Sequence, residues 1–558
     1  MSTVYNTIVL GLGAMGSAAL YQLAKRGDKV LGIDQYDPPH TLGSTHGGSR
    51  ITRQAIGEGL EYTPLSLRSY EIIKDIEEKT GEKLLLQCGG LMISNKAATG
   101  VHHVQNFFEV TVQAAKKFNI PHEELDAEAV RKRFPVFNIR DNEYAYFEPG
   151  AGLLYPEKVV ATQLKLAKEA GASVHTNELV VGIEQERDGK SFLVKVTTDK
   201  GVYLTRNLII SAGPWLQELL ELWYSPLVHL FQVVRQVMFW FDIEEVYEQF
   251  KPENFPIFIW ESAGDEPSSY GMPAIDGPKG GFKIASPKFN GVTTPGQINR
   301  QVSEEEIEAE RKELLETHFP SAGRQLIKSA VCMYTDTKDS NFILGRLPGQ
   351  ENIIIASPCS GHGFKHSPAI GECLAQLVLD GKTKLDTEAF TIESAYKRLT
   401  ANLHVPENLQ IPTEEDWGEY WNDLDGNYSH EKLAGRTLDD ALILIHELPL
   451  SHHECLQWMR PIPFCYYIHS YTLAFKTLLV DPHWESQMTG SCLLSLIKEK
   501  LHQEPETVLM VWDQIAATLE FVGKNQALLD ATPEVFGSFE EKYQEIVELV
   551  RQKSTQVH

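Results

Sequence analysis

The sequence predicts an α/β fold that opens with a Rossmann-type nucleotide-binding unit, carries an inserted antiparallel sheet and ends in an all-α region. Three observations support this prediction. A glycine-rich turn lies between a short apolar run and a helical pattern near the N-terminus. β-branched runs separated by turns fill residues 230–286. Beyond about residue 430 the apolar residues follow helical spacing, with few strand patterns.

The glycine-rich turn has the spacing of a dinucleotide-binding site. A short apolar run precedes Gly11-Leu12-Gly13-Ala14-Met15-Gly16, a helical pattern follows, and a second apolar run ends on Asp34. Gly11 permits the tight turn, Gly13 lets the backbone approach a pyrophosphate, and Gly16 lets the helix pack against the strand. Unpaired N–H groups at the helix N-terminus attract the anion. Asp34 can accept a hydrogen bond from a ribose hydroxyl, which favours FAD or NAD over NADP.

The remaining elements follow from periodicity and turn residues. Helices are predicted over residues 63–80, 101–118, 127–134 and 158–170, and strands over 84–93, 173–176, 179–186, 192–198 and 208–211. A separate antiparallel sheet is predicted from the runs at 230–243, 256–260, 269–273 and 281–286. A capped helix at 303–317, strands at 329–335 and 353–356, and a glycine turn leading into a helix that ends near 380 complete this part.

These elements indicate three regions. Residues 1–400 are expected to form a nucleotide-binding part (about 1–90, 150–220 and 325–385) with a substrate part inserted into it (about 91–149 and 221–324). Residues 401–430 are rich in proline, tryptophan and acids and are expected to be a linker. Residues 431–558 are expected to form a helical domain of unknown role, whose aromatic residues could build a core or an interface for a partner or for self-association.

Charge and cysteine content limit the possible functions. The chain of 558 residues has 51 basic and 76 acidic residues, a net charge of −25, which argues against a nucleic-acid or anionic membrane surface. Its seven cysteines are scattered without a C-x-x-C pair, as in proteins of a reducing compartment. We see no secretory signal pattern and no apolar run long enough for a transmembrane helix. A cytoplasmic protein without nucleic-acid or membrane partners is expected.

Three short segments carry polar chemistry at places where a bound cofactor could be reached. They are Gly43-Ser44-Thr45-His46-Gly47-Gly48-Ser49-Arg50-Ile51-Thr52-Arg53, Val331-Cys332-Met333-Tyr334-Thr335 and Ser360-Gly361-His362-Gly363-Phe364-Lys365-His366. Each has an ordinary explanation when taken alone: a solvated polar loop, a cysteine buried in a strand, and a structural or solvated Lys or His.

Taken together with the opening turn and Ala212-Gly213-Pro214-Trp215, these segments resemble the monomeric sarcosine oxidase and N-methyl-tryptophan oxidase family. The resemblance extends from the N-terminus to about residue 400, and the C-M-Y-T and S-G-H-G-F-K strings are typical of this group. It implies FAD as the cofactor and the fold shared by glutathione reductase and D-amino-acid oxidase.

The resemblance also implies roles for individual residues. Cys332 would be the covalent anchor of the flavin, through a thioether to its 8α-methyl group. Arg53 and Lys365 would bind the substrate carboxylate through charge-assisted hydrogen bonds of about 1.5–3 kcal/mol each. Lys283 would activate O2, since a fixed cation stabilises developing superoxide. Further site residues are expected near the flavin ring, in the substrate pocket and along the cofactor: Arg50 and His46; Tyr270 and Tyr334; Ser44, Val180, Gly213, Gly361, Gly363 and again Lys365.

The implied reaction is oxidation of a secondary, N-methyl α-amino acid by hydride transfer to FAD. The imine would hydrolyse to a primary amino acid and formaldehyde, and O2 would be reduced to H2O2. A cyclic imino acid such as proline or pipecolate is the alternative substrate, and a non-catalytic flavin-binding scaffold is the alternative function.

Three departures from the family pattern leave the substrate open. Pro287 replaces an active-site histidine, the loop between Tyr270 and Lys283 is two residues longer, and Pro358-Cys359 replaces a glycine–aromatic pair. In the C-terminal region no spacing among the candidate ligands favours a metal site: His446, His452, His453 and Cys455.

Overall fold

The computed structural model describes residues 4–95, 106–188, 191–223, 225–262, 268–287, 291–481 and 483–554. The chain forms two compact units. The first contains Met1–Trp223, Phe231–Leu347 and Glu351–Thr391, and the second contains Tyr224–Leu230, Pro348–Gln350 and Ile392–His558. No helix within the described ranges combines the length and apolarity needed to cross a bilayer.

The first sheet of the first unit is the predicted Rossmann-type sheet. Its eight strands run in the order β10-β11-β12-β1-β2-β9, with β20 beside β12 and β19 beside β20. Strand β1 pairs in parallel with β2 and β12, as a nucleotide-binding sheet requires. The strands are β1 (Val4–Leu10), β2 (Val30–Ile33), β9 (Ser173–His175), β10 (Val180–Asp188), β11 (Ser191–Thr198), β12 (Val202–Ile210), β19 (Ile343–Leu347) and β20 (Gln350–Ser357).

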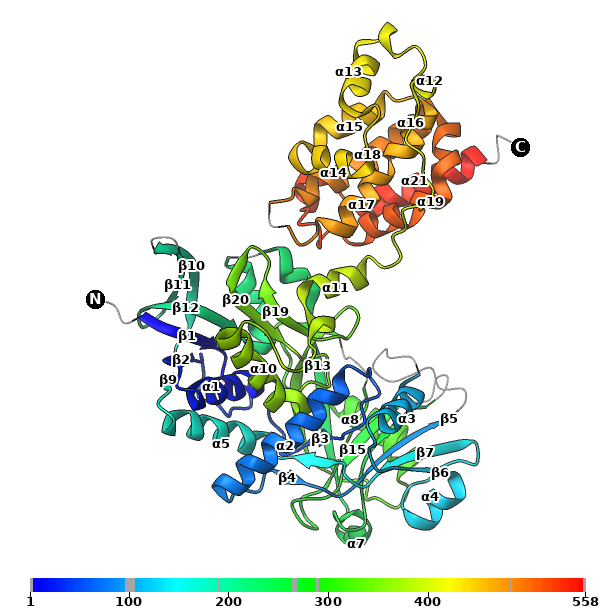
Figure 1. Cartoon of the computed structure of the whole chain (residues 1–558). Helices are drawn as coiled ribbons and strands as arrows, with labels where there is room; N and C mark the ends of the chain where they lie inside the picture. Colours follow the sequence, from blue (N-terminus) through cyan, green and yellow to red (C-terminus); the bar gives the residue numbers. More distant parts are fainter. Residues whose placement is uncertain are drawn as a thin grey trace. The chain divides into compact units, whose positions relative to one another are not determined.

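Apolar helices pack with this sheet around one core (Figure 1). Helix α1 (Ala14–Lys25) packs against both α5 (Pro156–Glu169) and α10 (Ser367–Asp380). The helices approach closely at Gly371, where a Cβ atom would lie 2.5 Å from Ala18. The other α-helices of this unit are α2 (Tyr62–Thr80), α3 (Phe107–Lys117), α4 (Ala127–Arg133), α6 (Leu216–Glu221), α7 (Tyr247–Phe250), α8 (Glu304–Glu310) and α9 (Glu316–His318).

The predicted second sheet is present and is larger than expected. Its nine strands run in the order β17-β13-β16-β15-β14-β5-β7-β6, with β18 beside β13, and its pairs are antiparallel except β5 with β14. The strands are β5 (Gly90–Asn95), β6 (Glu123–Asp126), β7 (Glu143–Glu148), β13 (Phe231–Phe241), β14 (Ile257–Trp260), β15 (Ser269–Met272), β16 (Phe282–Ala285), β17 (Val292–Thr293) and β18 (Leu326–Thr337). A third sheet contains β3 (Arg50–Thr52), β8 (Gly152–Leu154) and β4 (Leu85–Leu86).

Three sequence-based boundaries differ from the structure. The strand expected at 84–93 is two strands, β4 and β5, because Gly89 at φ +80° turns the chain between them. Strand β18 was expected in the nucleotide-binding part, but it pairs with β13 in the second sheet. The helix expected at 303–317 starts with a Ser303 capping box and is interrupted by a π-helical segment, Arg311–Leu315. Of the helix expected at 101–118, residues 101–105 lie outside the described residues.

The part of the second unit that begins at Ile392, drawn from yellow-green to red in Figure 1, is built from helices. The long helices α18, α19 and α21 pack pairwise against one another. Helix α12 and most of α13 lie within residues 401–430, so this segment is folded rather than a simple linker. The α-helices are α11 (Ile392–Leu399), α12 (Glu414–Trp417), α13 (Leu424–Leu433), α14 (Leu438–Glu447), α15 (Pro449–Gln457), α16 (Pro461–Tyr467), α17 (His469–Thr477), α18 (Ser486–Gln503), α19 (Pro505–Lys524), α20 (Pro533–Phe536) and α21 (Phe539–Ser554).

Candidate active site

The first unit contains a cavity of about 560 Å³ that both of its large sheets help to line. Most of the residues singled out from the sequence are in its wall, although they come from distant parts of the chain. Those in the wall are Gly11, Gly13, Asp34, Ser44, Arg50, Arg53, Val180, Gly213, Tyr270, Lys283, Cys332, Tyr334, Gly361, Gly363 and Lys365. Gly16 and His46 are not among the lining residues, and Pro358 and Cys359 are.

At one end of the cavity the β1–α1 turn is shaped for an anionic group. Gly11 has φ +81°, and a Cβ atom there would lie 2.5 Å from the Ser211 carbonyl oxygen. A Cβ atom on Gly16 would lie 1.7 Å from the Gly11 oxygen, so this position also requires glycine. At Gly13 a Cβ atom would meet only Thr45 Oγ1, at 3.8 Å, and no side chain caps the start of α1. The turn therefore fits the pyrophosphate of a dinucleotide.

Asp34 has a second role that its sequence position did not predict. Its Oδ2 accepts a hydrogen bond from the Leu12 N–H (2.7 Å), and its Oδ1 accepts one from the Tyr36 N–H (2.8 Å). Burial raises the pKa of this carboxyl group, and the two backbone donors oppose that shift. Asp34 thus fixes the glycine turn as well as facing the cavity.

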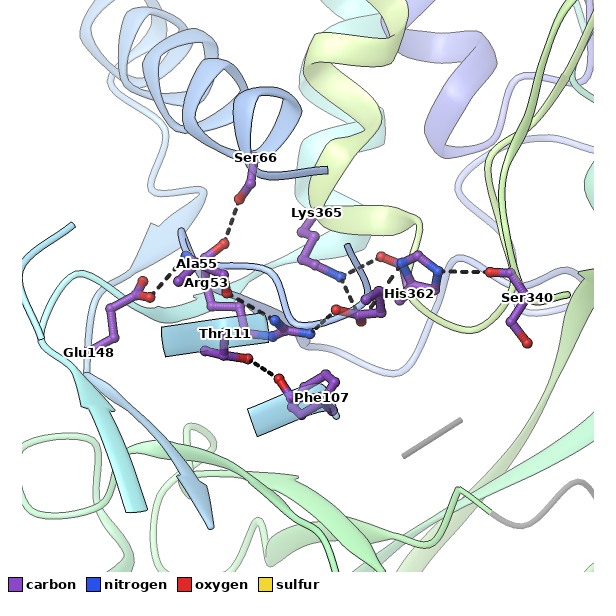
Figure 2. Close-up of polar contacts among 10 residues, drawn as sticks. Arg53, Ala55, Ser66, Phe107, Thr111, Glu148, Ser340, His362 and Lys365 are labelled. Carbon is purple, nitrogen blue, oxygen red and sulfur yellow. Dashed lines mark hydrogen bonds and ion pairs between the residues drawn. The ribbon is translucent and has the colours of Figure 1, made fainter. Parts of the chain in front are cut away.

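The two cations predicted to bind a carboxylate share a buried glutamate (Figure 2). Arg53 is 1% exposed, and its Nη2 lies 2.5 Å from Glu58 Oε2. Lys365 Nζ lies 3.8 Å from Glu58 Oε1 and donates a hydrogen bond to the His362 carbonyl oxygen at 2.6 Å. Burial opposes ionisation of Glu58, but Arg53, Lys365 and His362 outweigh it and hold its pKa well below the ordinary value. The site therefore contains an internal carboxylate.

This cation pair retains capacity for a second anion. Burial lowers the pKa of Lys365 to about 7, with Glu58 opposing and Arg53 reinforcing the shift. Arg53 Nε is buried and has no hydrogen-bond partner among the described residues. Both side chains also line the cavity, so a ligand carboxylate can reach them.

A second group of cations holds the loop over residues 43–50. Lys283 is 3% exposed, and its Nζ donates to the Gly47 and Ser49 carbonyl oxygens at 3.0 and 2.9 Å. Burial, reinforced by Arg50, lowers the pKa of Lys283 well below its ordinary value. Arg50 itself donates from Nη2 to the Ser44 carbonyl oxygen at 2.7 Å.

Two further residues complete this loop. Glu157 Oε1 accepts hydrogen bonds from the Gly47 and Gly48 N–H groups at 2.7 and 3.0 Å, an anchor that no sequence motif indicated. His46 is 3% exposed, and burial together with Arg50 lowers its pKa to about 4. The imidazole is therefore neutral at pH 7, and it lies behind the cavity wall.

Strand β18 places Cys332 and Tyr334 in the cavity wall. Cys332 pairs with Gln236 of β13 and is 1% exposed, and burial raises the pKa of its thiol while Arg50 and Lys283 lower it. The hydroxyl groups of Tyr270 and Tyr334 lie 3.0 Å apart. Burial raises the pKa of Tyr270 to about 12, so its hydroxyl is neutral near pH 7.

Two of the candidate metal ligands in the second unit, His446 and His452, have local partners. His446 Nε2 lies 2.8 Å from Asp481 Oδ2, and His452 Nε2 lies 2.9 Å from Ser470 Oγ. Within the described ranges, no group of three or more His, Cys, Asp or Glu side chains is arranged to hold a metal ion.

Comparison with known proteins gives consistent results for the first unit. Residues 6–377 match the family of FAD dependent oxidoreductases. Monomeric sarcosine oxidase of Streptomyces avermitilis is 40% identical over 384 residues, which cover 69% of this chain and 96% of that protein. N-methyl-L-tryptophan oxidase of Yersinia pestis is 34% identical over 390 residues, 70% of this chain and 98% of that protein. The structure of L-proline dehydrogenase from P. horikoshii is similar in fold, with a TM-score of 0.59 at 22% identity over 71% of this chain and 99% of that one.

Proposed function

This chain belongs to the FAD-dependent oxidoreductases, in the group of monomeric sarcosine oxidases and N-methyl-tryptophan oxidases, and we propose that it oxidises an N-methyl α-amino acid with O2 as electron acceptor. One observation carries the choice of an amino acid. Arg53 and Lys365 are both buried, and both line the cavity where a carboxylate can reach them.

The cofactor-binding residues divide along the cavity. Gly11, Gly13 and the start of α1 would hold the pyrophosphate of FAD, Asp34 the ribose, and the Val180 backbone the adenine. Ser44, Gly213, Gly361 and Gly363 would complete the cradle, with Cys332 as the covalent anchor. Bound FAD supplies the hydride acceptor and returns the two electrons to O2.

Arg53 and Lys365 would orient the substrate through its carboxylate. Glu58 contributes one negative charge against these two positive groups, so an incoming carboxylate would bind beside Glu58. With Lys365 protonated, the second carboxylate would bring the charge of the group to zero, which limits the cost of its burial. The free N–H of Arg53 Nε adds a donor that Glu58 does not use.

The rest of the pocket would position the amine without a strong base. The Tyr270 and Tyr334 hydroxyl groups give a neutral polar wall. A neutral secondary amine can lie against this wall. Its proximity and orientation would then favour transfer of a hydride from the N-methyl carbon to the bound flavin. Hydrolysis of the resulting imine would yield the primary amino acid and formaldehyde, and O2 would leave as H2O2.

Lys283 would act in the oxygen-dependent half of the cycle. Its amino group donates to the Gly47 and Ser49 carbonyl oxygens at the cavity wall, so its position is fixed before the reaction. Burial and Arg50 lower its pKa well below the ordinary value, and this role requires the protonated form. A preorganised cation stabilises negative charge that develops on O2.

Peroxide release by the purified full-length protein tests this proposal. We expect sarcosine or a larger N-methyl amino acid to give H2O2, formaldehyde and the primary amino acid in equal amounts. Release of H2O2 from proline or pipecolate alone would establish the cyclic substrate instead. A flavin-loaded protein that none of these compounds reduces would be a binding protein rather than an oxidase.

A further inference from the structure

Glu148, at the end of β7, is a fully buried carboxylate that binds two consecutive backbone N–H groups. Its Oε1 accepts from the Gln54 N–H at 2.6 Å, and its Oε2 accepts from the Ala55 N–H at 3.1 Å. The Tyr146 hydroxyl donates a third hydrogen bond to Oε2 at 3.0 Å. Glu148 is 0% exposed and is not among the cavity-lining residues, so it does not reach the substrate directly.

The backbone of Ala55 links this carboxylate to the guanidinium of Arg53 through the two peptide groups that flank its Cα atom. The Ala55 N–H is held by Glu148, and the Ala55 carbonyl oxygen accepts a hydrogen bond from Arg53 Nη1 at 2.9 Å. Figure 2 shows the guanidinium of Arg53 directed toward Lys365, while its backbone lies on the Glu148 side. A shift of the Ala55 backbone that moves its carbonyl oxygen therefore changes where the guanidinium can lie.

The other end of the same loop is fixed by packing. At Gly57 a Cβ atom would lie 2.5 Å from Thr111 Oγ1 and 2.6 Å from the Phe107 carbonyl oxygen. The Arg53 guanidinium also lies over the Phe107 ring, 4.9 Å from its centre. Glu148 thus holds residues 54 and 55, which directly follow Arg53, while α3 packs against Gly57, which directly precedes Glu58.

A carboxylate suits this position better than its amide. Two N–H donors and one hydroxyl converge on two oxygens, and a carboxylate accepts at both. A glutamine offers one acceptor oxygen, so one backbone N–H would lose its partner inside the protein. An unsatisfied buried donor is costly, and the loop would move to relieve it.

We propose that Glu148 is a positioning residue, which sets the affinity for the substrate carboxylate by holding the Arg53–Ala55 backbone. This inference rests on the proposed role of Arg53 in carboxylate binding. It assigns to Glu148 an effect on KM rather than on the chemical step.

The full-length holoenzyme with Glu148→Gln tests this assignment. We expect KM for the N-methyl amino acid to rise about tenfold with kcat nearly unchanged, because one buried hydrogen bond is lost from the loop. Acetate, an inert carboxylate, should bind the oxidised enzyme correspondingly more weakly when titrated by flavin absorbance. The matched control is Tyr146→Phe, which removes the third hydrogen bond but keeps both backbone bonds and should change KM less.

The outcomes distinguish failure of the proposed carboxylate site from failure of the positioning role of Glu148. If acetate changes neither the wild-type spectrum nor wild-type turnover, the protein has no carboxylate site of the proposed kind. That result would contradict the proposed function. Acetate that binds wild type and Glu148→Gln equally would overturn the inference alone. Equal losses of kcat, FAD content and acetate affinity would also overturn it, because they indicate a general structural role. If Glu148→Gln does not fold, Glu148→Asp keeps the charge, and an unchanged KM in that variant contradicts the inference.

Discussion

Lys283 and Lys365 in the first unit and Lys500 in the helical unit are nearly excluded from solvent, with 3%, 4% and 0% exposure. Their surroundings differ. Lys500 Nζ donates to the Met459 carbonyl oxygen at 3.1 Å and lies 3.2 Å from Glu504 Oε2, and Lys500 is not among the residues that line the cavity. Lys283 and Lys365 line that cavity, together with Arg50 and Arg53.

The comparison shows that a buried cation alone does not mark a functional site. In the second unit the Met459 carbonyl oxygen and Glu504 are the partners of Lys500, and burial still lowers its pKa. In the first unit several cations gather at one cavity, and Glu58 is the carboxylate within ion-pair distance of both Arg53 and Lys365. Convergence on a cavity, with spare donor capacity, distinguishes a binding site from a structural ion pair.

The largest expected effect concerns the proposed covalent link at Cys332. Wild-type protein precipitated with acid should stay yellow, whereas Cys332→Ala should release all of its flavin into the supernatant. Cys359→Ala is the matched control, because Cys359 also lines the cavity. A colourless wild-type pellet would exclude the link, and release only from Cys359→Ala would move it to that residue.

Replacement of Lys283 by methionine should separate the two halves of the reaction. Reoxidation of the reduced enzyme by O2 should slow by about 10²-fold, because a preorganised cation is lost. Anaerobic reduction by substrate should change much less, and stopped-flow absorbance measures both rates. Lys500→Met is the control in the helical unit. It should leave both rates unchanged and lower the free energy of unfolding by about 1–3 kcal/mol, since it removes a buried hydrogen-bond donor. Slower reduction with normal reoxidation in Lys283→Met would refute the assignment.

Carboxylate binding should weaken as pH rises through the pKa of Lys365, about 7. Of the two protonation states of Lys365, only the ammonium attracts the carboxylate by its charge. The dissociation constant of acetate should therefore be low below this pKa and rise above it. Glu58→Gln removes the charge that raises this pKa, and the transition should move to lower pH. Acetate titrations followed by flavin absorbance, at a series of pH values around 7, measure the dissociation constant and the pH of its transition for wild type and for Glu58→Gln. A dissociation constant that is the same on both sides of pH 7 would contradict this role of Lys365.

Removal of the helices that follow Pro406 should have the smallest effect on oxidation. We propose that the oxidase is complete within residues 1–400, so a chain that ends near Pro406, which keeps Tyr224–Leu230, Pro348–Gln350 and helix α11 of the second unit, should bind FAD and produce peroxide at nearly the wild-type rate. An insoluble or flavin-free product would show that the helical unit is part of the oxidase fold.

Local patterns predicted the parts of the fold that depend on short segments. The Gly11–Gly16 turn, the parallel β1–β2 pair and the antiparallel sheet around β13 were all visible as periodicity and turn residues. Strand β18 was misplaced because its partner, β13, lies about 100 residues earlier, and no local pattern encodes that pairing. The helices within 401–430 were missed because prolines and acids there resemble a linker, although Thr413 and Asp416 form a capping box.

The site residues that belong to a recognisable sequence motif could be predicted. Arg53 and Lys365 were found through the family resemblance, and the structure places both at one glutamate. Glu58 is five residues after Arg53 in the sequence, but neither this spacing nor the resemblance gave it a role as the shared partner of Arg53 and Lys365. Glu148 and Glu157 are about 95 to 110 residues from the loops they hold, so only the folded chain brings them together.

Carboxylate recognition by Arg53 is tested most directly by comparing Arg53→Met with wild type on two substrates, an N-methyl amino acid and the same N-methylamine without its carboxylate. Anaerobic flavin reduction gives the rate and apparent affinity for each. We expect the ratio of the reduction rate constant to the apparent dissociation constant to fall about 10–100-fold for the amino acid, with little change for the amine, because one charge-assisted partner of the carboxylate is lost. An unchanged ratio between the two substrates would contradict carboxylate recognition by Arg53.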